Sequence, residues 1–257
     1  MRASLSRCLF AVSLIFGSTA FAAPIAPTVT FEDGLLLTTS DIAGVADYTT
    51  SGAEMAGMLV RATFSDGTTE ESIWQATGAV SGGATGLDWG VKFDFATTFS
   101  NTDRWEVEMD AGSSRTMVGL FFDGRPGDTI FDVIGSPDLT PDSEAGIVFG
   151  DGLVDGPSGM DINATYRNKV ALGNVFYNDL FTVLDLEFIG TGLSAGDVMT
   201  FFADTDNPGT PGDIRPFGVP SPSSIALIGL GLAALFLMRR RTLEKQNSQT
   251  AFVPQFA

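Results

Sequence analysis

The stretch RWEVEMD, which runs from Arg104 to Asp110, decides the fold class of this 257-residue chain. Its apolar residues Trp105, Val107 and Met109 occupy every second position, and charged residues occupy the positions between them. Period-two alternation places the apolar side chains on one face of a β-strand and the charged side chains on the other. The stretch therefore predicts a strand with one face in a core and one face in water.

The same alternation recurs on both sides of this stretch. Residues 89–95 alternate Trp, Val and Phe with Gly, Lys and Asp, and residues 184–188 alternate Leu and Phe with Asp and Glu. Turn-forming pairs such as Asp66-Gly67 and Asp123-Gly124 separate the predicted strands. No long helical period occurs outside the two ends of the chain. About eleven short strands at this spacing predict an all-β domain, a β-sandwich or jelly roll, over residues 23–205.

Composition excludes several classes of site. The chain has no His, so catalytic triads and zinc sites that use His are ruled out. It has 30 Gly, 44% hydrophobic residues and 18% charged residues. Its single Cys, Cys8, excludes disulfides within the chain. The formal net charge is −17, and residues 23–218 hold 8 Lys+Arg against 30 Asp+Glu. Such acidity argues against a nucleic-acid partner.

The N-terminal region predicts an export signal. Arg2 and Arg7 are followed by an apolar run over residues 8–16. Ala20 and Ala22 then fit the small-x-small pattern that signal peptidase reads, which places the cleavage between Ala22 and Ala23. We therefore expect residues 1–22 to be a signal peptide. The alternative is an amphipathic first helix of the fold.

The C-terminal region predicts a short membrane anchor. Residues 225–238 are uninterruptedly apolar, and Arg239, Arg240 and Arg241 follow directly. We expect a single transmembrane helix over residues 223–238, because flanking arginines can extend a short apolar span. A basic cluster stays cytoplasmic, so residues 23–218 are expected on the far side of the membrane. The alternative is a helix buried in the core.

Residues 219–241 resemble a PEP-CTERM sorting signal. Val219, Pro220, Ser221 and Pro222 open the segment, a Gly- and Leu-rich span follows, and the Arg cluster ends it. The resemblance implies an exosortase-like sorting enzyme as partner and an exopolysaccharide-producing Gram-negative bacterium as source. The same segment is also labelled an ice-binding-protein C-terminal domain. Ser221 stands where the family usually has Glu.

The regions flanking this signal are predicted to lack a fold of their own. We expect residues 206–218 to form a Pro/Gly linker and residues 242–257 a disordered cytoplasmic tail, although the family usually ends soon after its arginines. Three segments of the middle region, residues 129–132, 140–146 and 201–207, are similar to segments common in PEP-CTERM ectodomains. This looser resemblance also implies a β-sandwich.

Asp204, Asp206 and Asn207 are the candidate metal ligands. Alternating oxygen ligands on a loop suit Ca²⁺, and an acidic domain without disulfides gains stability from such an ion. The full calcium-loop pattern is absent, so the alternative is a solvated strand end. No other cofactor is expected.

Two further patterns suggest action on carbohydrate. Glu106 with Glu108, or Asp185 with Glu187, supply carboxylate pairs of the kind used in glycoside hydrolysis, although the default interpretation is that they lie on the water-facing sides of amphipathic strands. The three tryptophans offer a sugar-stacking platform, with core packing as the default interpretation. They are Trp74, Trp89 and Trp105.

The sequence as a whole predicts an exported, non-enzymatic protein of the bacterial cell surface or extracellular matrix. It would pass through a single-pass inner-membrane intermediate before it reaches the surface or the medium. The competing hypotheses are an exopolysaccharide-binding module and a carboxylate-based glycoside hydrolase. No catalytic residue is assigned.

Overall fold

The computed structural model describes residues 23–40, 45, 50–98, 100, 102–133, 146–151, 154–208 and 211–218, with the single positions 230, 232, 235 and 239. The predicted signal peptide (1–22), the predicted tail (242–257) and most of the sorting segment lie outside the described residues. The described part is almost entirely β-structure, which confirms the all-β prediction.

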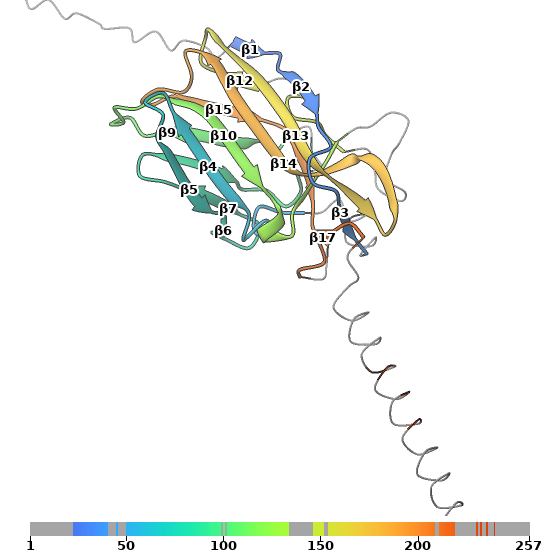
Figure 1. Cartoon of the computed structure of the whole chain (residues 1–257). Helices are drawn as coiled ribbons and strands as arrows, with labels where there is room; N and C mark the ends of the chain where they lie inside the picture. Colours follow the sequence, from blue (N-terminus) through green and yellow to red (C-terminus); the bar gives the residue numbers. More distant parts are fainter. Residues whose placement is uncertain are drawn as a thin grey trace, which may run out of the picture.

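Two antiparallel-rich sheets pack face to face (Figure 1). The seven-stranded sheet has the order β1-β12-β15-β9-β8-β7-β6. Its strands are β1 (Ala23–Ile25), β12 (Val154–Gly156), β15 (Val198–Phe201), β9 (Trp105–Met109), β8 (Trp89–Phe93), β7 (Gly82–Thr85) and β6 (Gln75–Ala76).

The ten-stranded sheet follows the path β17-β3-β13-β14-β10-β4-β5, with β2, β11 and β16 attached beside it. Its strands are β17 (Arg215–Pro216), β3 (Leu37–Thr39), β13 (Met160–Leu172), β14 (Val175–Gly190), β10 (Met117–Asp123), β4 (Leu59–Phe64), β5 (Thr69–Ile73), β2 (Thr28–Phe31), β11 (Ile130–Asp132) and β16 (Asp204–Asp206). A short 3-10 helix, η1 (Arg125–Gly127), follows β10.

The main core lies between the two sheets. On β9, Trp105, Val107 and Met109 are buried while Glu106 and Glu108 face away, as the alternation of the sequence predicts. The facing sheet contributes buried residues of β4, β10 and β14 to the same cluster. Every residue of both core clusters falls between residues 25 and 214, so this segment contains the hydrophobic core of the described part of the chain.

Part of the segment expected to be a linker belongs to the sheet. Arg215 and Pro216 form β17 and pair with β3, and the Phe217 amide donates to the Leu36 carbonyl at 2.9 Å. Asp213 accepts hydrogen bonds from Thr39 Oγ1 at 2.5 Å and from the Ser40 amide at 2.6 Å. The Pro/Gly-rich composition of residues 206–218 did not reveal these side-chain and edge-strand contacts.

Candidate functional site

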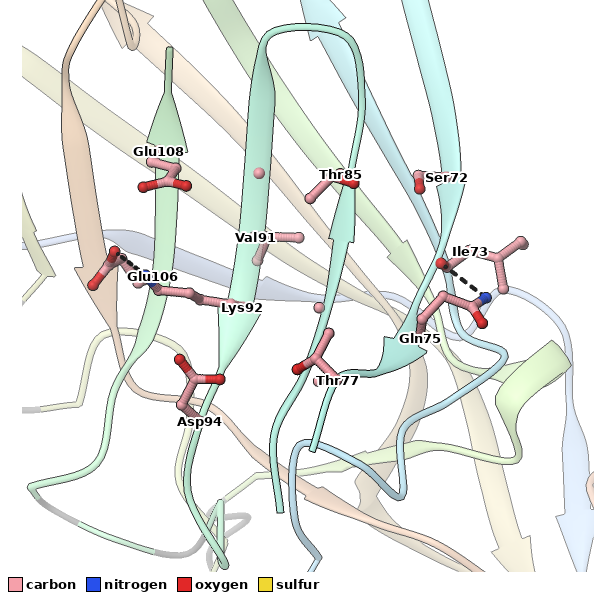
Figure 2. Close-up of a pocket in the computed structure, with 13 residues that line it drawn as sticks. Ser72, Ile73, Gln75, Thr77, Thr85, Val91, Lys92, Asp94, Glu106 and Glu108 are labelled. Atoms are coloured by element: carbon pink, nitrogen blue, oxygen red, sulfur yellow. Dashed lines mark hydrogen bonds and ion pairs between the residues drawn. The ribbon is translucent and has the colours of Figure 1, made fainter. Parts of the chain in front are cut away.

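A groove of about 380 Å³ lies on the face of the seven-stranded sheet that is turned away from the core (Figure 2). Strands β7, β8 and β9 form its floor, and residues at the end of β5 and in β6 form its wall. We call it the outer groove. Its charged floor residues lie on the face opposite Trp105 and Val107, whereas Val91, which also lines it, is a core residue.

Two rows of residues cross the floor of the outer groove. In the first row Gly90 pairs with Thr85 on one side and with Glu108 on the other. In the second row Lys92 pairs with Gly83 and with Glu106. Each row therefore contains one glycine, which adds no side chain to the floor of the groove.

The side chains around this space are polar. Ser72, Thr77 and Thr85 present hydroxyl groups, and Gln75 presents an amide whose Nε2 donates to the Ile73 carbonyl at 3.3 Å. The side chain of Ile73 is 44% exposed and supplies an apolar surface on the same wall. The outer groove thus combines hydrogen-bonding groups with apolar surface, to which Ile73 and Val91 contribute.

One ion pair sits in the floor. Lys92 Nζ lies 2.8 Å from Glu106 Oε1, and Glu108 and Asp94 also line the groove. The hydrogen bond to Glu106, with the nearby charges of Glu108 and Asp94, raises the pKa of Lys92 against the opposing effect of its partial burial. Lys92 therefore stays charged, and three carboxylates surround this single cation.

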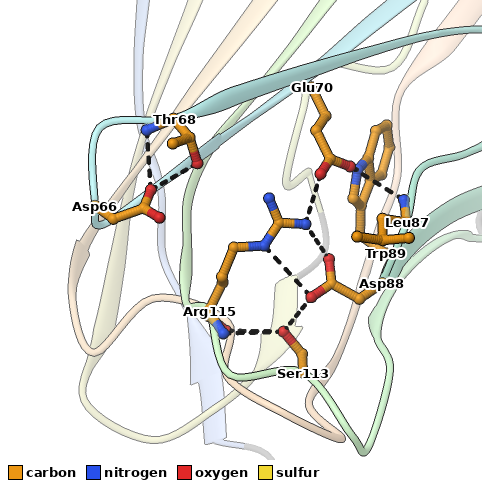
Figure 3. A network of polar contacts seen from close by, with 8 residues as sticks. All are labelled: Asp66, Thr68, Glu70, Leu87, Asp88, Trp89, Ser113 and Arg115. Atoms are coloured by element: carbon orange, nitrogen blue, oxygen red, sulfur yellow. Dashed lines mark hydrogen bonds and ion pairs between the residues drawn. The ribbon is translucent and has the colours of Figure 1, made fainter.

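A polar network holds the neighbouring end of the sandwich together (Figure 3). Arg115 Nη2 contacts Glu70 Oε1 of β5 at 2.6 Å and also pairs with Asp88 in the turn between β7 and β8. Glu70 Oε2 accepts from Trp89 Nε1 at 2.9 Å and from the Leu87 amide at 3.1 Å. The network therefore ties β5 of one sheet to the β7–β8 hairpin of the other, and these elements carry the wall and floor of the groove.

The candidate calcium ligands occupy a buried strand pair instead of a loop. Asp204 and Asp206 belong to β16, and Asp204 stands opposite Asp132 of β11. Both side chains are buried, so the solvated strand end considered above is not what the structure shows. Asn207 Nδ2 donates to the Glu54 carbonyl at 3.0 Å.

The environment of Asp204 raises its pKa to about 7. Burial is the main cause, and the hydrogen bonds to its carboxylate only partly oppose it. Asp204 Oδ1 accepts from Thr98 Oγ1 at 2.8 Å and from the Thr205 amide at 2.9 Å. Among the residues that the structure describes, no group of three or more acidic, His or Cys side chains is placed to hold a metal ion. Calcium binding stays a prediction.

The tryptophans are core residues, which confirms the default interpretation. Trp74, Trp89 and Trp105 are at most 2% exposed. Trp74 Nε1 donates to the Gly52 carbonyl at 2.7 Å, and Trp105 Nε1 donates to the Ala203 carbonyl at 2.9 Å. With their rings in the core and their indole nitrogens bonded, they form no sugar-stacking platform.

The two acid pairs differ in their surroundings. Glu106 and Glu108 come together in the outer groove, whereas Asp185 is bound by Arg167, and Glu187 accepts a hydrogen bond from Asn163 Nδ2 at 3.1 Å. Burial raises the pKa of Asp185 despite the nearby arginines. Sequence reasoning found Glu106 and Glu108 but missed the groove. The sequence signal for it is Gly90, a glycine at a position where the alternation of the strand places polar side chains.

Most of the predicted sorting and cleavage residues lie outside the described residues. This holds for Ala20, Ala22, Val219, Pro220, Ser221, Pro222, Arg240 and Arg241. Ala23 is the first residue of β1, and Arg239 is helical and exposed. Leu230, Leu232 and Leu235 are also helical, with 70%, 63% and 63% of their surface exposed. Within the described positions, no helix has the length and apolarity needed to cross a membrane.

Comparison with known families decides the nature of the C-terminal segment. Residues 218–241 match the family described as the PEP-CTERM protein-sorting motif. The chain carries a PEP-CTERM sorting motif. This motif is the mark of a protein that an exosortase-type enzyme sorts to the cell surface, and it confirms the resemblance seen in the sequence. The chain matches no curated protein and no solved structure.

Proposed function

We propose that this chain is an exported cell-surface or extracellular-matrix protein without enzymatic activity. In this proposal its β-sandwich is translocated, held by the C-terminal segment as a single-pass intermediate, and then processed at the sorting motif. The observation that carries the proposal is the junction between fold and motif. The last strand, β17, ends at Pro216, and the PEP-CTERM motif begins at residue 218.

This junction makes the sandwich separable from its anchor. Because every core residue among those the structure describes precedes residue 215, cleavage within residues 219–222 removes none of them. Asp213 and β17 also fix the end of the sandwich to β3 and to Ser40. The released product would therefore keep its fold, as a surface or matrix protein must.

The arrangement of the acid pair favours a non-enzymatic role. Glu106 and Glu108 share the outer groove, but Glu106 is held in an ion pair by Lys92. A glycosidase needs one protonated carboxyl group, usually kept neutral by an apolar pocket. In the outer groove a lysine ammonium, that of Lys92, lies beside the acid pair instead.

The test follows the C-terminal segment in cells. We expect the mass of the exported protein to show loss of the residues after the motif in cells that have the sorting enzyme, and retention in cells that lack it. Equal accumulation of the full-length chain in both strains would contradict the proposal. Separately, purified residues 23–218 should release no reducing ends from soluble polysaccharides, and release that Glu108→Gln abolishes would establish the glycosidase instead.

A further inference from the structure

The geometry of the outer groove points to a ligand, and we propose that it binds a short segment of an uncharged polysaccharide. This inference gives the proposed surface protein a binding partner and so rests on the proposed function. It depends on the groove alone, however, and not on the tryptophans, which the structure places in the core.

The first argument is that no close packing contact requires a glycine at position 90. A Cβ built on Gly83 would lie 2.6 Å from the Val91 carbonyl oxygen, so packing explains that glycine. A Cβ on Gly90 would instead meet Glu108 Oε1 at 3.5 Å and Thr85 Cγ2 at 3.7 Å, which are ordinary contacts. Glycine weakens a strand interior, and it often marks a place where a ligand approaches the backbone. No close packing contact therefore requires glycine at this position, which lies buried in the floor of the groove between Thr85 and Glu108.

The second argument is the hydrogen-bonding capacity around this space. Within the described residues, the hydroxyl groups of Ser72, Thr77 and Thr85 make no hydrogen bond to another residue, and neither does the Glu108 carboxylate. These groups are free to exchange bound water for the hydroxyl groups of a ligand. A sugar unit, with a hydroxyl on most of its carbons, matches a wall of short hydroxyl and carboxylate groups.

The third argument is charge, which selects among polysaccharides. The groove contains Asp94, Glu106 and Glu108 against the single cation Lys92, and this cation is already paired with Glu106. Residues 23–218 as a whole hold 30 Asp+Glu against 8 Lys+Arg. A polymer of uronate or sulfated units would be repelled both locally and at long range. An uncharged polymer escapes this repulsion and still uses the carboxylates as hydrogen-bond acceptors.

The experiment uses the isolated segment 23–218, which contains every core residue that the structure describes. Its migration is measured by affinity electrophoresis in gels containing dextran, mannan or mixed-linkage β-glucan as uncharged probes. Alginate serves as the anionic probe and chitosan oligomers as the cationic probe. We expect at least one uncharged polysaccharide to retard the protein and alginate to leave it unaffected.

The Gly90→Leu substitution fills the floor of the groove and should weaken this binding at least tenfold. The matched control is Gly112→Leu, because a Cβ on Gly112 meets no atom within 4 Å and the position lies outside the groove. The melting temperatures of both variants are measured, and the smaller Gly90→Ala replaces Gly90→Leu if that variant does not fold.

Several outcomes would overturn the inference. Binding that survives at Gly90→Leu places the ligand elsewhere. Retardation by chitosan alone would show attraction between opposite charges and not recognition of an uncharged sugar. If none of the uncharged probes retards the protein, an uncharged polysaccharide is ruled out as the ligand. Because this assay uses a soluble segment, its failure leaves the sorting experiment standing, and failure of sorting leaves this assay unaffected.

Discussion

The guanidinium carbon of Arg115 lies 3.8 Å from the centre of the Phe64 ring, in cation–π contact with the last residue of β4. The same guanidinium pairs with Glu70 and Asp88, so an aromatic ring of the core and two carboxylates share one cation. Planar delocalised charge suits arginine to both kinds of contact at once. Arg115 therefore acts as a link between the core and the turn beside the outer groove.

Replacing Arg115 should destabilise the sandwich more than replacing a similar arginine at the surface. Arg115→Ala leaves two carboxylates that are only 25% and 17% exposed without their cation, so we expect the melting temperature to fall by several degrees. Arg61→Ala is the control, because its pair with Glu71 is exposed and such pairs contribute little. Calorimetry of the two variants checks the prediction, and equal effects would contradict it.

The cost of Arg115→Ala should also depend on pH. A backbone hydrogen bond from Leu87 and the Arg115 guanidinium lower the pKa of Glu70, and Arg115 with Ser113 lowers the pKa of Asp88. Groups with a lowered folded-state pKa add stability above their unfolded-state pKa, and this stability is lost as pH falls through the folded-state value. The difference between wild type and variant should therefore be largest near neutral pH and shrink in acid.

Asp204 should give the opposite pH dependence. Burial raises its pKa from 3.8 to about 7, so the folded state binds the proton more tightly than the unfolded state. Its contribution to stability is complete below pH 4 and is lost as pH rises toward 7, at about 1.4 kcal/mol per pKa unit. Asp204→Asn mimics the neutral form and should flatten this loss between pH 4 and 7. Urea unfolding at several pH values checks it, with the exposed Asp161→Asn as control.

The same variant tests the calcium prediction. A bound ion requires the ionised carboxylate of Asp204, so calcium should raise the melting temperature mainly above pH 7 and should not do so in Asp204→Asn. A melting temperature that a chelator leaves unchanged at pH 8 would contradict calcium binding. The pH dependence in the absence of calcium would stand in either case.

The sequence predicted the strands whose two faces differ most. β9 was recognisable because its buried tryptophan and aliphatic side chains alternate with glutamates. β7, with the sequence GGAT, was missed because small residues carry no alternation, although its pairing with β8 shapes the groove. In β14 the run from Asp179 to Leu184 is buried on both faces, so no period of two was visible there.

Local sequence was equally limited in predicting the surroundings of the candidate sites. Asp204 and Asp206 looked like loop ligands because Asp is rare in strand interiors. Their strand, β16, nevertheless pairs with β11, so both residues belong to a strand. The outer groove depends on Gly90 and Gly83 standing in register with Thr85 and Lys92, and register between strands is not written in local composition. Glu106 and Glu108 could be predicted as solvent-facing, but not as neighbours of Ser72 and Gln75 from other strands.

Signal peptidase should leave Ala23 as the first residue of the exported protein. β1 begins at Ala23 and pairs with β12, so cleavage after Ala22 removes no described strand. Ala22→Leu should block cleavage, because the enzyme requires a small side chain there, whereas Phe21→Leu at the tolerant middle position should not. N-terminal sequencing of the exported protein checks both variants. An exported protein that retains Met1 would contradict the predicted cleavage.

Processing at the PEP-CTERM motif should respond to the residue at position 221. The family usually has Glu where this chain has Ser221, so Ser221→Glu restores the missing carboxylate and should speed loss of the C-terminal segment. Pro220 and Pro222 oppose helix formation, which would keep the backbone extended and open to an enzyme. Pro222→Ala should therefore slow processing, while the exposed Asp161→Ala on β13 should leave its rate unchanged. The rates are measured by mass after a pulse of synthesis, in cells with and without the sorting enzyme. If Ser221→Glu and Pro222→Ala are both processed at the wild-type rate, the enzyme does not read this segment, and the matched motif serves only to anchor the chain.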